Sequence, residues 1–149
     1  MGDTEKRSVA IVGSGPGGMY VAQALVEKAP DCRIDIFDRL PTPFGLIRGG
    51  VAPDHQHTKR VDRKYADTIT ENRQIRYIGN VTLGQDVSLD DLAAIYDAVV
   101  LAYGAPYDNK LGIPGEDKKN VFGSNAFVGW YNCHPDFKDL GPDLKIDGA

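Results

Sequence analysis

A glycine cluster near the N-terminus, GSGPGG at residues 13–18, constrains the fold of this chain more than any other feature. It fits the pattern G-x-G-x-x-G, which binds dinucleotides when it follows a buried strand and opens a helix. The apolar run VAIV (9–12) predicts that strand, and the apolar spacing over 17–27 predicts the helix. The alternating segment RIDIFD (33–38) predicts a second strand, so the chain begins with a βαβ unit.

Each glycine of the cluster has its own expected role. Gly13 makes the tight turn, Gly15 lets the backbone approach a pyrophosphate, and Gly18 lets the helix pack closely on the strand. The anion would meet the free N–H groups and the positive dipole end of the helix. Asp38 ends the second strand, where a carboxylate accepts hydrogen bonds from ribose hydroxyls. These residues favour dinucleotide binding over a plain glycine turn.

The glycine pattern alone does not separate FAD from NAD or NADP. The carboxylate of Asp38 would repel a 2′-phosphate, which argues against NADP at this site. FAD and NAD both remain open on these residues.

The connection after the second strand is unusually long. It runs from about residue 40 to residue 57, whereas connections in such units usually have about 2–6 residues. Its central part, PFGLIRGGVAPDH (43–55), alternates apolar residues with glycine and proline. We therefore expect an ordered loop that serves the binding site.

The remaining elements are expected to continue the α/β pattern. They are a helix over 59–71, strands at 75–78 and 81–83, a helix over 88–96, a buried parallel strand at 98–102 and a helix over 126–132. Ser88 and Asp91 have the spacing of a capping box at the start of the second of these helices. The prediction is one α/β domain, a parallel sheet with flanking helices.

Composition and charge argue against several kinds of binding partner. The chain has 149 residues and a formal charge of −4, which gives no general attraction to nucleic acid or anionic membranes, and no apolar run is long enough to span a membrane. Cys32 and Cys133 are expected to be buried thiols, and no residue spacing predicts a metal site. The short charged N-terminus shows no leader, so a cytoplasmic location is expected.

Several longer segments together resemble one family. They are VAIVGSGPGGMY, LPTPFGLIRGGVAPDH, IGNVTLGQDV, YDAVVLAYGA, IPGED and FVGWYN, which extend over essentially the whole chain. The chain resembles the adrenodoxin-reductase type of ferredoxin–NADP reductase, a flavoprotein with two dinucleotide-binding domains. The resemblance implies that residues 1–149 form the first segment of its Rossmann-like FAD-binding domain, incomplete relative to the family and without the NADPH domain.

The resemblance also implies roles for individual residues. Gly17 would offer its backbone to the FAD pyrophosphate, and Asp38 would hold the adenosine ribose. Leu46 and Leu83 would contact the cofactor. His55 would lie near the isoalloxazine ring and take part in hydride or proton handling.

The implied activity is electron transfer from NADPH through FAD to a ferredoxin- or adrenodoxin-like iron–sulfur protein. The 149-residue chain alone is expected to be inactive, because the sequence has one match to G-x-G-x-x-G and NADPH needs a second. The alternative function is a non-catalytic, truncated FAD- or NAD(P)-binding module.

Overall fold

A parallel sheet forms the centre of the computed structural model, which describes residues 7–145. Its strands lie in the order β3-β2-β1-β4. Their bounds are β1 Ser8–Val12, β2 Arg33–Phe37, β3 Ile75–Ile78 and β4 Ala98–Leu101. β1 pairs in parallel with both β2 and β4, so the strand before the glycine cluster is central. The predicted fold class, α/β with a Rossmann-like parallel sheet, is confirmed.

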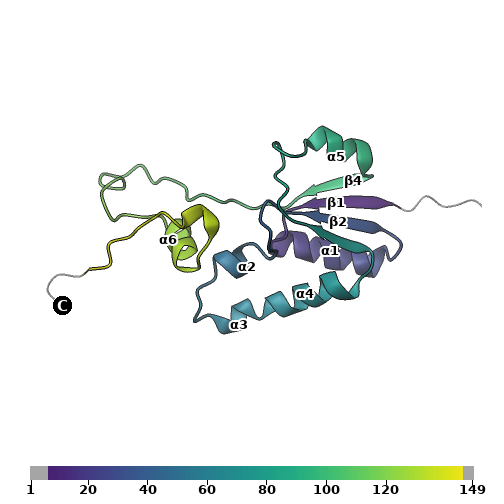
Figure 1. The fold of residues 1–149 in the computed structure, drawn as a ribbon, viewed down its shortest axis with the longest axis horizontal. Helices are drawn as coiled ribbons and strands as arrows, with labels where there is room; N and C mark the ends of the chain where they lie inside the picture. Colours follow the sequence, from purple (N-terminus) through teal and green to yellow (C-terminus); the bar gives the residue numbers. More distant parts are fainter. Residues whose placement is uncertain (1–6, 146–149) are drawn as a thin grey trace, which may run out of the picture.

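Helices cover both faces of the sheet (Figure 1). α1 (Pro16–Lys28) and α4 (Val61–Glu71) lie on one face, and α5 (Leu89–Ile95) lies on the other. Side chains alternate along the strands accordingly: Ile11 packs in the core with α1 and α4, whereas Val12 packs with Leu92 of α5. Residues 9–12 of β1 are apolar on both faces because both faces of this central strand are covered.

The ends of the helices follow from the local sequence. α1 begins at Pro16, whose fixed φ and missing N–H suit a first helical position. Ser88 is the N-cap of α5: its hydroxyl accepts from the Asp91 N–H at 3.0 Å, and the Asp91 carboxylate accepts from the Ser88 N–H at 3.0 Å. The predicted capping box is therefore confirmed.

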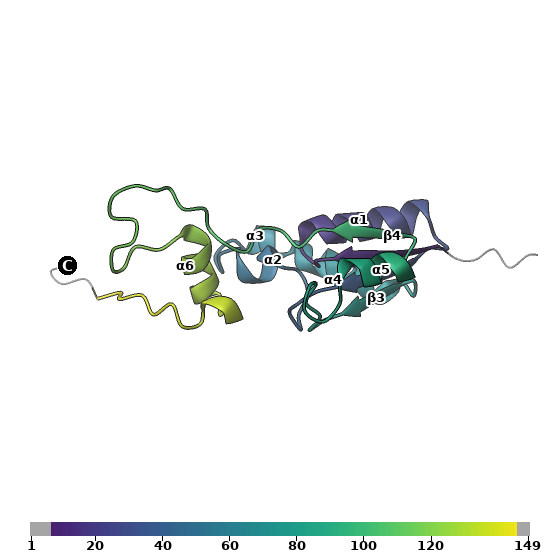
Figure 2. The same ribbon diagram turned by 90° about the horizontal axis from the view of Figure 1, so that it is seen from above.

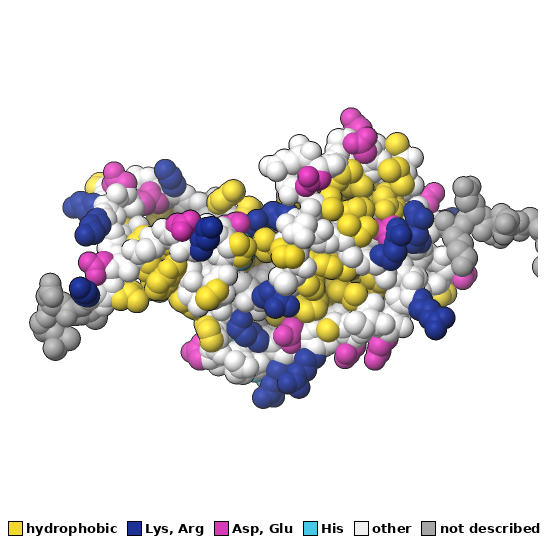
Figure 3. All heavy atoms as spheres, in the orientation of Figure 1, with side chains coloured by type: hydrophobic (Ala, Val, Ile, Leu, Met, Phe, Trp, Pro, Cys, Tyr) yellow, Lys and Arg dark blue, Asp and Glu magenta, His cyan; other side chains and the backbone are white. Residues whose placement is uncertain are grey.

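Two strand predictions need correction. Residues 81–83 form no strand: Leu83 makes one isolated bridge to Val87, because the carboxylate of Asp86 accepts from the Thr82 N–H and closes a turn. Residues 98–101 form the parallel strand β4, but it lies at the sheet edge and is not buried. Its last residue, Leu101, is 48% exposed. Figure 3 shows hydrophobic side chains at the surface beside β4 and α5.

The segment expected to be a loop contains two short helices. α2 (Leu46–Gly49) and α3 (Gln56–Lys59) are one turn each, and α4 follows directly. Hydrogen bonds within the turns account for them, such as Gly49 N–H to the Gly45 carbonyl at 3.0 Å. The segment is ordered, as expected, but it is not without secondary structure.

The C-terminal elements lie beyond the carboxyl ends of the strands, on the side of α2 (Figures 1 and 2). They are α6 (Ser124–Tyr131) and the 3₁₀ turn η1 (Pro135–Phe137). Asp108 accepts backbone N–H bonds from Asn125 and Ala126 and so stabilises the start of α6. Cys133 is exposed, contrary to expectation, because it lies in the turn between α6 and η1. No described helix is long and apolar enough to cross a bilayer.

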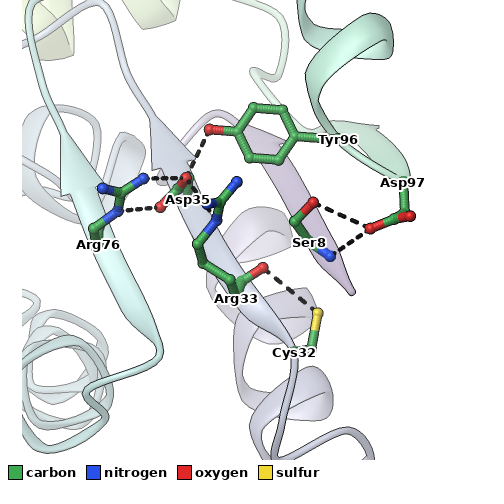
Figure 4. Close-up of polar contacts among 7 residues, drawn as sticks. All are labelled: Ser8, Cys32, Arg33, Asp35, Arg76, Tyr96 and Asp97. Carbon is green, nitrogen blue, oxygen red and sulfur yellow. Dashed lines mark hydrogen bonds and ion pairs between the residues drawn. The ribbon is translucent and has the colours of Figure 1, made fainter. Parts of the chain in front are cut away.

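One buried carboxylate lies on the sheet face that α5 covers (Figure 4). Asp35 of β2 has no exposed surface and accepts two hydrogen bonds from the Arg76 guanidinium, both 2.6 Å long. The Tyr96 hydroxyl donates a third at 2.6 Å, and Arg33 Nε lies 3.6 Å away. Burial by itself raises the pKa of Asp35, but the hydrogen bonds from Arg76 and Tyr96 outweigh it and hold the pKa below its usual value.

The lowered pKa predicts how acid acts on the fold. The unfolded chain protonates Asp35 at its ordinary pKa of about 4, whereas the folded chain resists protonation, so Asp35 stabilises the fold above that pH and the contribution is lost as pH falls further. We expect the unfolding free energy of Asp35→Asn to change less between about pH 5 and 2 than that of the wild type. Urea unfolding at each pH measures this free energy. We expect the change for Tyr96→Phe to lie between those of the wild type and of Asp35→Asn. Equal pH dependence in all three proteins would contradict the assignment.

Candidate dinucleotide-binding site

A cavity of about 710 Å³ lies at the carboxyl ends of β1, β2 and β4. Ligands of open parallel sheets bind at this edge. Six of the eight residues predicted for the site line the cavity: Gly13, Gly15, Gly17, Asp38, Leu46 and Leu83. Segments far apart in the sequence therefore meet at one place, as the motifs predict.

Gly13 and Gly18 each allow a close backbone contact, Gly13 with the segment that follows β4 and Gly18 with the turn that precedes α1. Gly13 has a φ of +107°, and a Cβ there would overlap the backbone carbonyl of Ala102. A Cβ on Gly18 would overlap the carbonyl oxygen of Gly13. Gly18 is buried behind the turn and is not among the residues that line the cavity. Both glycines shape the site through the backbone.

Gly15 and Gly17 face open space instead. A Cβ on Gly15 would meet nothing within 4 Å, and one on Gly17 would lie 3.9 Å from the Ala102 methyl group. Gly15 is the N-cap of α1, so the first N–H groups of this helix, which have no partner within it, lie beside the cavity. Bare backbone at a helix start is a cradle for a phosphate group.

Asp38 is held in place by two backbone segments. Its Oδ2 accepts from the Ser14 N–H at 2.9 Å and from the Ser14 hydroxyl, and its Oδ1 accepts from the Leu40 N–H at 2.9 Å. The carboxylate is half-buried and lies at the cavity. The position of Asp38 was predicted, but its bonds to Ser14 had no signal in the sequence, because the residue between the first two glycines is variable in the pattern.

The long connection after β2 is seated on the glycine turn. Phe44 is buried and has a φ of +90°, which is unusual for a residue with a side chain. Its N–H is shared between the carbonyl and hydroxyl oxygens of Ser14, at 3.1 and 3.3 Å, and its ring lies 6.0 Å from that of Tyr65. The next residue, Gly45, packs so close that a Cβ would lie 3.0 Å from the Gly15 Cα. Leu46 is thereby brought to the cavity, with 57% of it exposed.

Sequence reasoning missed a contribution from the C-terminal segment. Arg39 and His134 both line the cavity. Arg39 forms a forked ion pair with Asp136, with distances of 2.9 and 2.5 Å, and this hydrogen bonding lowers the pKa of Asp136. His134 lies against Gly49 of α2, where a Cβ would be 2.6 Å from its Cδ2. These contacts join parts of the chain about 90 positions apart, which no local pattern reveals.

His55, predicted to lie near a flavin ring, is not among the cavity-lining residues. It is the N-cap of α3 and is exposed, and its side chain makes no capping hydrogen bond. The histidine that the structure brings to the cavity is His134. The role of His55 stays a prediction.

The different surroundings of Gly15 and Gly18 predict different responses to a methyl group. Gly18→Ala should lower the unfolding free energy by about 2–3 kcal/mol, because the Gly13 carbonyl must move. Gly15→Ala should change it by no more than about 1 kcal/mol, because the Cβ meets open space and an N-cap glycine has only a small advantage. Urea unfolding compares the two variants. Equal destabilisation would contradict the assigned roles.

Comparisons with known proteins agree with this architecture. Residues 11–66 match the model of the NAD(P)-binding Rossmann-like domain. The mitochondrial NADPH:adrenodoxin oxidoreductase of Arabidopsis thaliana is 50% identical over 141 residues, which are 95% of this chain and 29% of that protein. The NADPH-ferredoxin reductase FprA of Mycobacterium tuberculosis is 43% identical over 142 residues, covering 92% of this chain and 31% of that protein.

A solved structure extends the similarity to three dimensions. Mycobacterium tuberculosis FprA in complex with NADPH superposes with a TM-score of 0.89 at 42% identity, covering 94% of this chain and 32% of that one. The chain thus spans about a third or less of the length of these relatives. In sequence and in fold, the chain matches one segment of the adrenodoxin-reductase type of ferredoxin–NADP reductase, and the resemblance predicted from its motifs is confirmed.

Proposed function

We propose that the chain binds FAD in the cavity at the carboxyl ends of its strands. It would form the N-terminal, FAD-binding portion of an NADPH-dependent oxidoreductase that passes electrons through FAD to a ferredoxin- or adrenodoxin-like iron–sulfur protein. The observation that carries the proposal is the seating of residues 44–46 on the glycine turn. A plain dehydrogenase fingerprint has no need of such a loop beside the phosphate cradle.

The residues at the cavity fit this cofactor. The open backbone at Gly15 and Gly17 suits the pyrophosphate, and Asp38 suits the adenosine ribose. A 2′-phosphate would meet the Asp38 carboxylate, and the nearby Arg39 is already paired with Asp136. The site therefore favours FAD over NADP, and NADP would bind to a domain outside residues 1–149.

The chain itself would bind and orient the cofactor. Leu46 and Leu83 offer apolar surface at the cavity, which would exclude water from the flavin end. FAD, when bound, supplies the redox chemistry, because it takes up electrons in pairs and releases them one at a time. His55 could take part in proton handling only if its imidazole, exposed at the N-cap of α3, approached the flavin ring.

Two further points remain open. The names of the Arabidopsis relative and of several others include a mitochondrial location, and the cytoplasmic location expected for this chain stays a prediction. The second candidate function is a non-catalytic FAD- or NAD(P)-binding module. It is favoured by the single G-x-G-x-x-G match in the sequence.

Gly15→Val tests FAD binding. The branched side chain would project into the open space where the pyrophosphate is proposed to lie, so we expect FAD affinity to fall beyond detection while the fold persists. Quenching of flavin fluorescence during titration measures binding, and thermal unfolding checks the fold. Ala24→Val, at an exposed position on the same helix, is the matched control and should bind FAD as the wild type does. Unchanged binding by Gly15→Val would contradict the pyrophosphate site.

Turnover distinguishes the two candidate functions. We expect the 149-residue chain, supplied with FAD, to give no NADPH-dependent reduction of a ferredoxin, because one dinucleotide site cannot hold both cofactors. Ferredoxin absorbance under anaerobic conditions measures the reaction. Joining the chain to the remaining two thirds of a close relative should restore it. Turnover by the chain alone would contradict the proposal that this chain binds FAD and that NADPH binds to a different domain.

A further inference from the structure

We propose that Ser14 is a positioning residue that sets the ribose-binding carboxylate and the flavin-side loop at the same time. The inference rests on the proposed function. It assigns the ribose of FAD to Asp38 and the flavin end of FAD to the loop at Phe44, and both of these residues bond Ser14. Ser14 is completely buried and lies between Gly13 and Gly15, which both line the cavity.

The first partner of Ser14 is Asp38. The Ser14 N–H and hydroxyl both donate to Oδ2, and the Leu40 N–H donates to Oδ1. A carboxylate has about four acceptor positions, so three are used within the protein and about one is left for a ribose hydroxyl. Ser14 thus decides which lone pair Asp38 presents to the cavity.

The second partner of Ser14 is Phe44. The hydroxyl that donates to Asp38 also accepts from the Phe44 N–H, at 3.3 Å, and the Ser14 carbonyl accepts from the same N–H at 3.1 Å. Phe44 has a φ of +90°, a strained backbone that persists only where its surroundings hold it. Two residues later, Leu46 reaches the cavity.

One hydroxyl therefore connects the two ends of the binding site. The hydroxyl donates its proton to the Asp38 carboxylate and accepts from the Phe44 N–H with one of its two lone pairs, so both partners favour the same orientation of the hydroxyl. A ligand that touches both Asp38 and Leu46 is recognised by two elements fixed to each other. Loss of the hydroxyl should free Asp38 and loosen residues 43–48 together.

The chain offers a matched control at the other end of β1. The Ser8 N–H and hydroxyl donate to Oδ2 of Asp97, at 2.7 and 3.1 Å, in the pattern that Ser14 makes with Asp38 (Figure 4). Ser8 is nearly buried, and neither residue of this pair lines the cavity. Ser8→Ala therefore removes an equivalent serine–carboxylate bond away from the site.

The test measures FAD affinity and loop anchoring in Ser14→Ala and Ser8→Ala. Ser14→Ala should raise the dissociation constant for FAD about tenfold, because a hydrogen bond to a charged group is lost. In ligand-free protein, it should speed tryptic cleavage after Arg48 at least about threefold, because local opening becomes easier. Ser8→Ala should leave both values within about twofold of the wild type. If Ser14→Ala does not fold, Ser14→Gly removes the same hydroxyl.

A double-mutant cycle separates positioning from general destabilisation. In an Asp38→Ala background, Ser14→Ala should change FAD affinity by clearly less than the roughly tenfold expected in the wild-type background, because one of the two partners through which Ser14 acts is already lost. Equal effects in both backgrounds, or equal effects of Ser14→Ala and Ser8→Ala, would overturn the proposal. A wild-type chain that binds no FAD would contradict the proposed function and the ribose role with it. The cleavage comparison would then decide separately whether Ser14 anchors the loop.

Discussion

The close approach of α1 to the turn after β1 is the constraint on which the rest of the site depends. Gly18 has no Cβ, so the helix lies directly against the Gly13 carbonyl. In that position the first N–H groups of the helix lie beside the cavity, and Ser14, in the same turn, contacts Asp38 just after β2. A binding site assembled from several separate segments thus begins with a packing requirement at one backbone contact.

Much of this architecture could be predicted because its signals are local. The strand before the glycines, the helix after them and the capping box of Ser88 and Asp91 all follow from short patterns. Several of the failures have tertiary causes. Residues 98–102 have the composition of a buried strand, yet β4 lies at the sheet edge, because composition does not give a strand its place in the order. Arg39 and His134 join the cavity through contacts with Asp136 and Gly49, which sequence distance conceals.

The role of Lys59 also could not be predicted from the sequence. The basic residues at 59–64 are usual for a solvated helix face or for a surface that steers an acidic partner. The Lys59 ammonium instead donates to the carbonyls of Ile47 and Arg48, both at 3.2 Å, and stabilises the carboxyl end of α2. It therefore supports the loop that carries Leu46 to the cavity. A contact within the fold accounts for this residue without any partner.

The two serine–carboxylate pairs have a consequence for β1 as a whole. Ser8 bonds Asp97 just before β4, and Ser14 bonds Asp38 just after β2, so the central strand is tied at both ends and to both neighbours. Sliding β1 by one residue would break both pairs at once and turn Ile11 toward α5. The two pairs thus oppose register slippage, which apolar side chains on both faces of a strand resist only weakly.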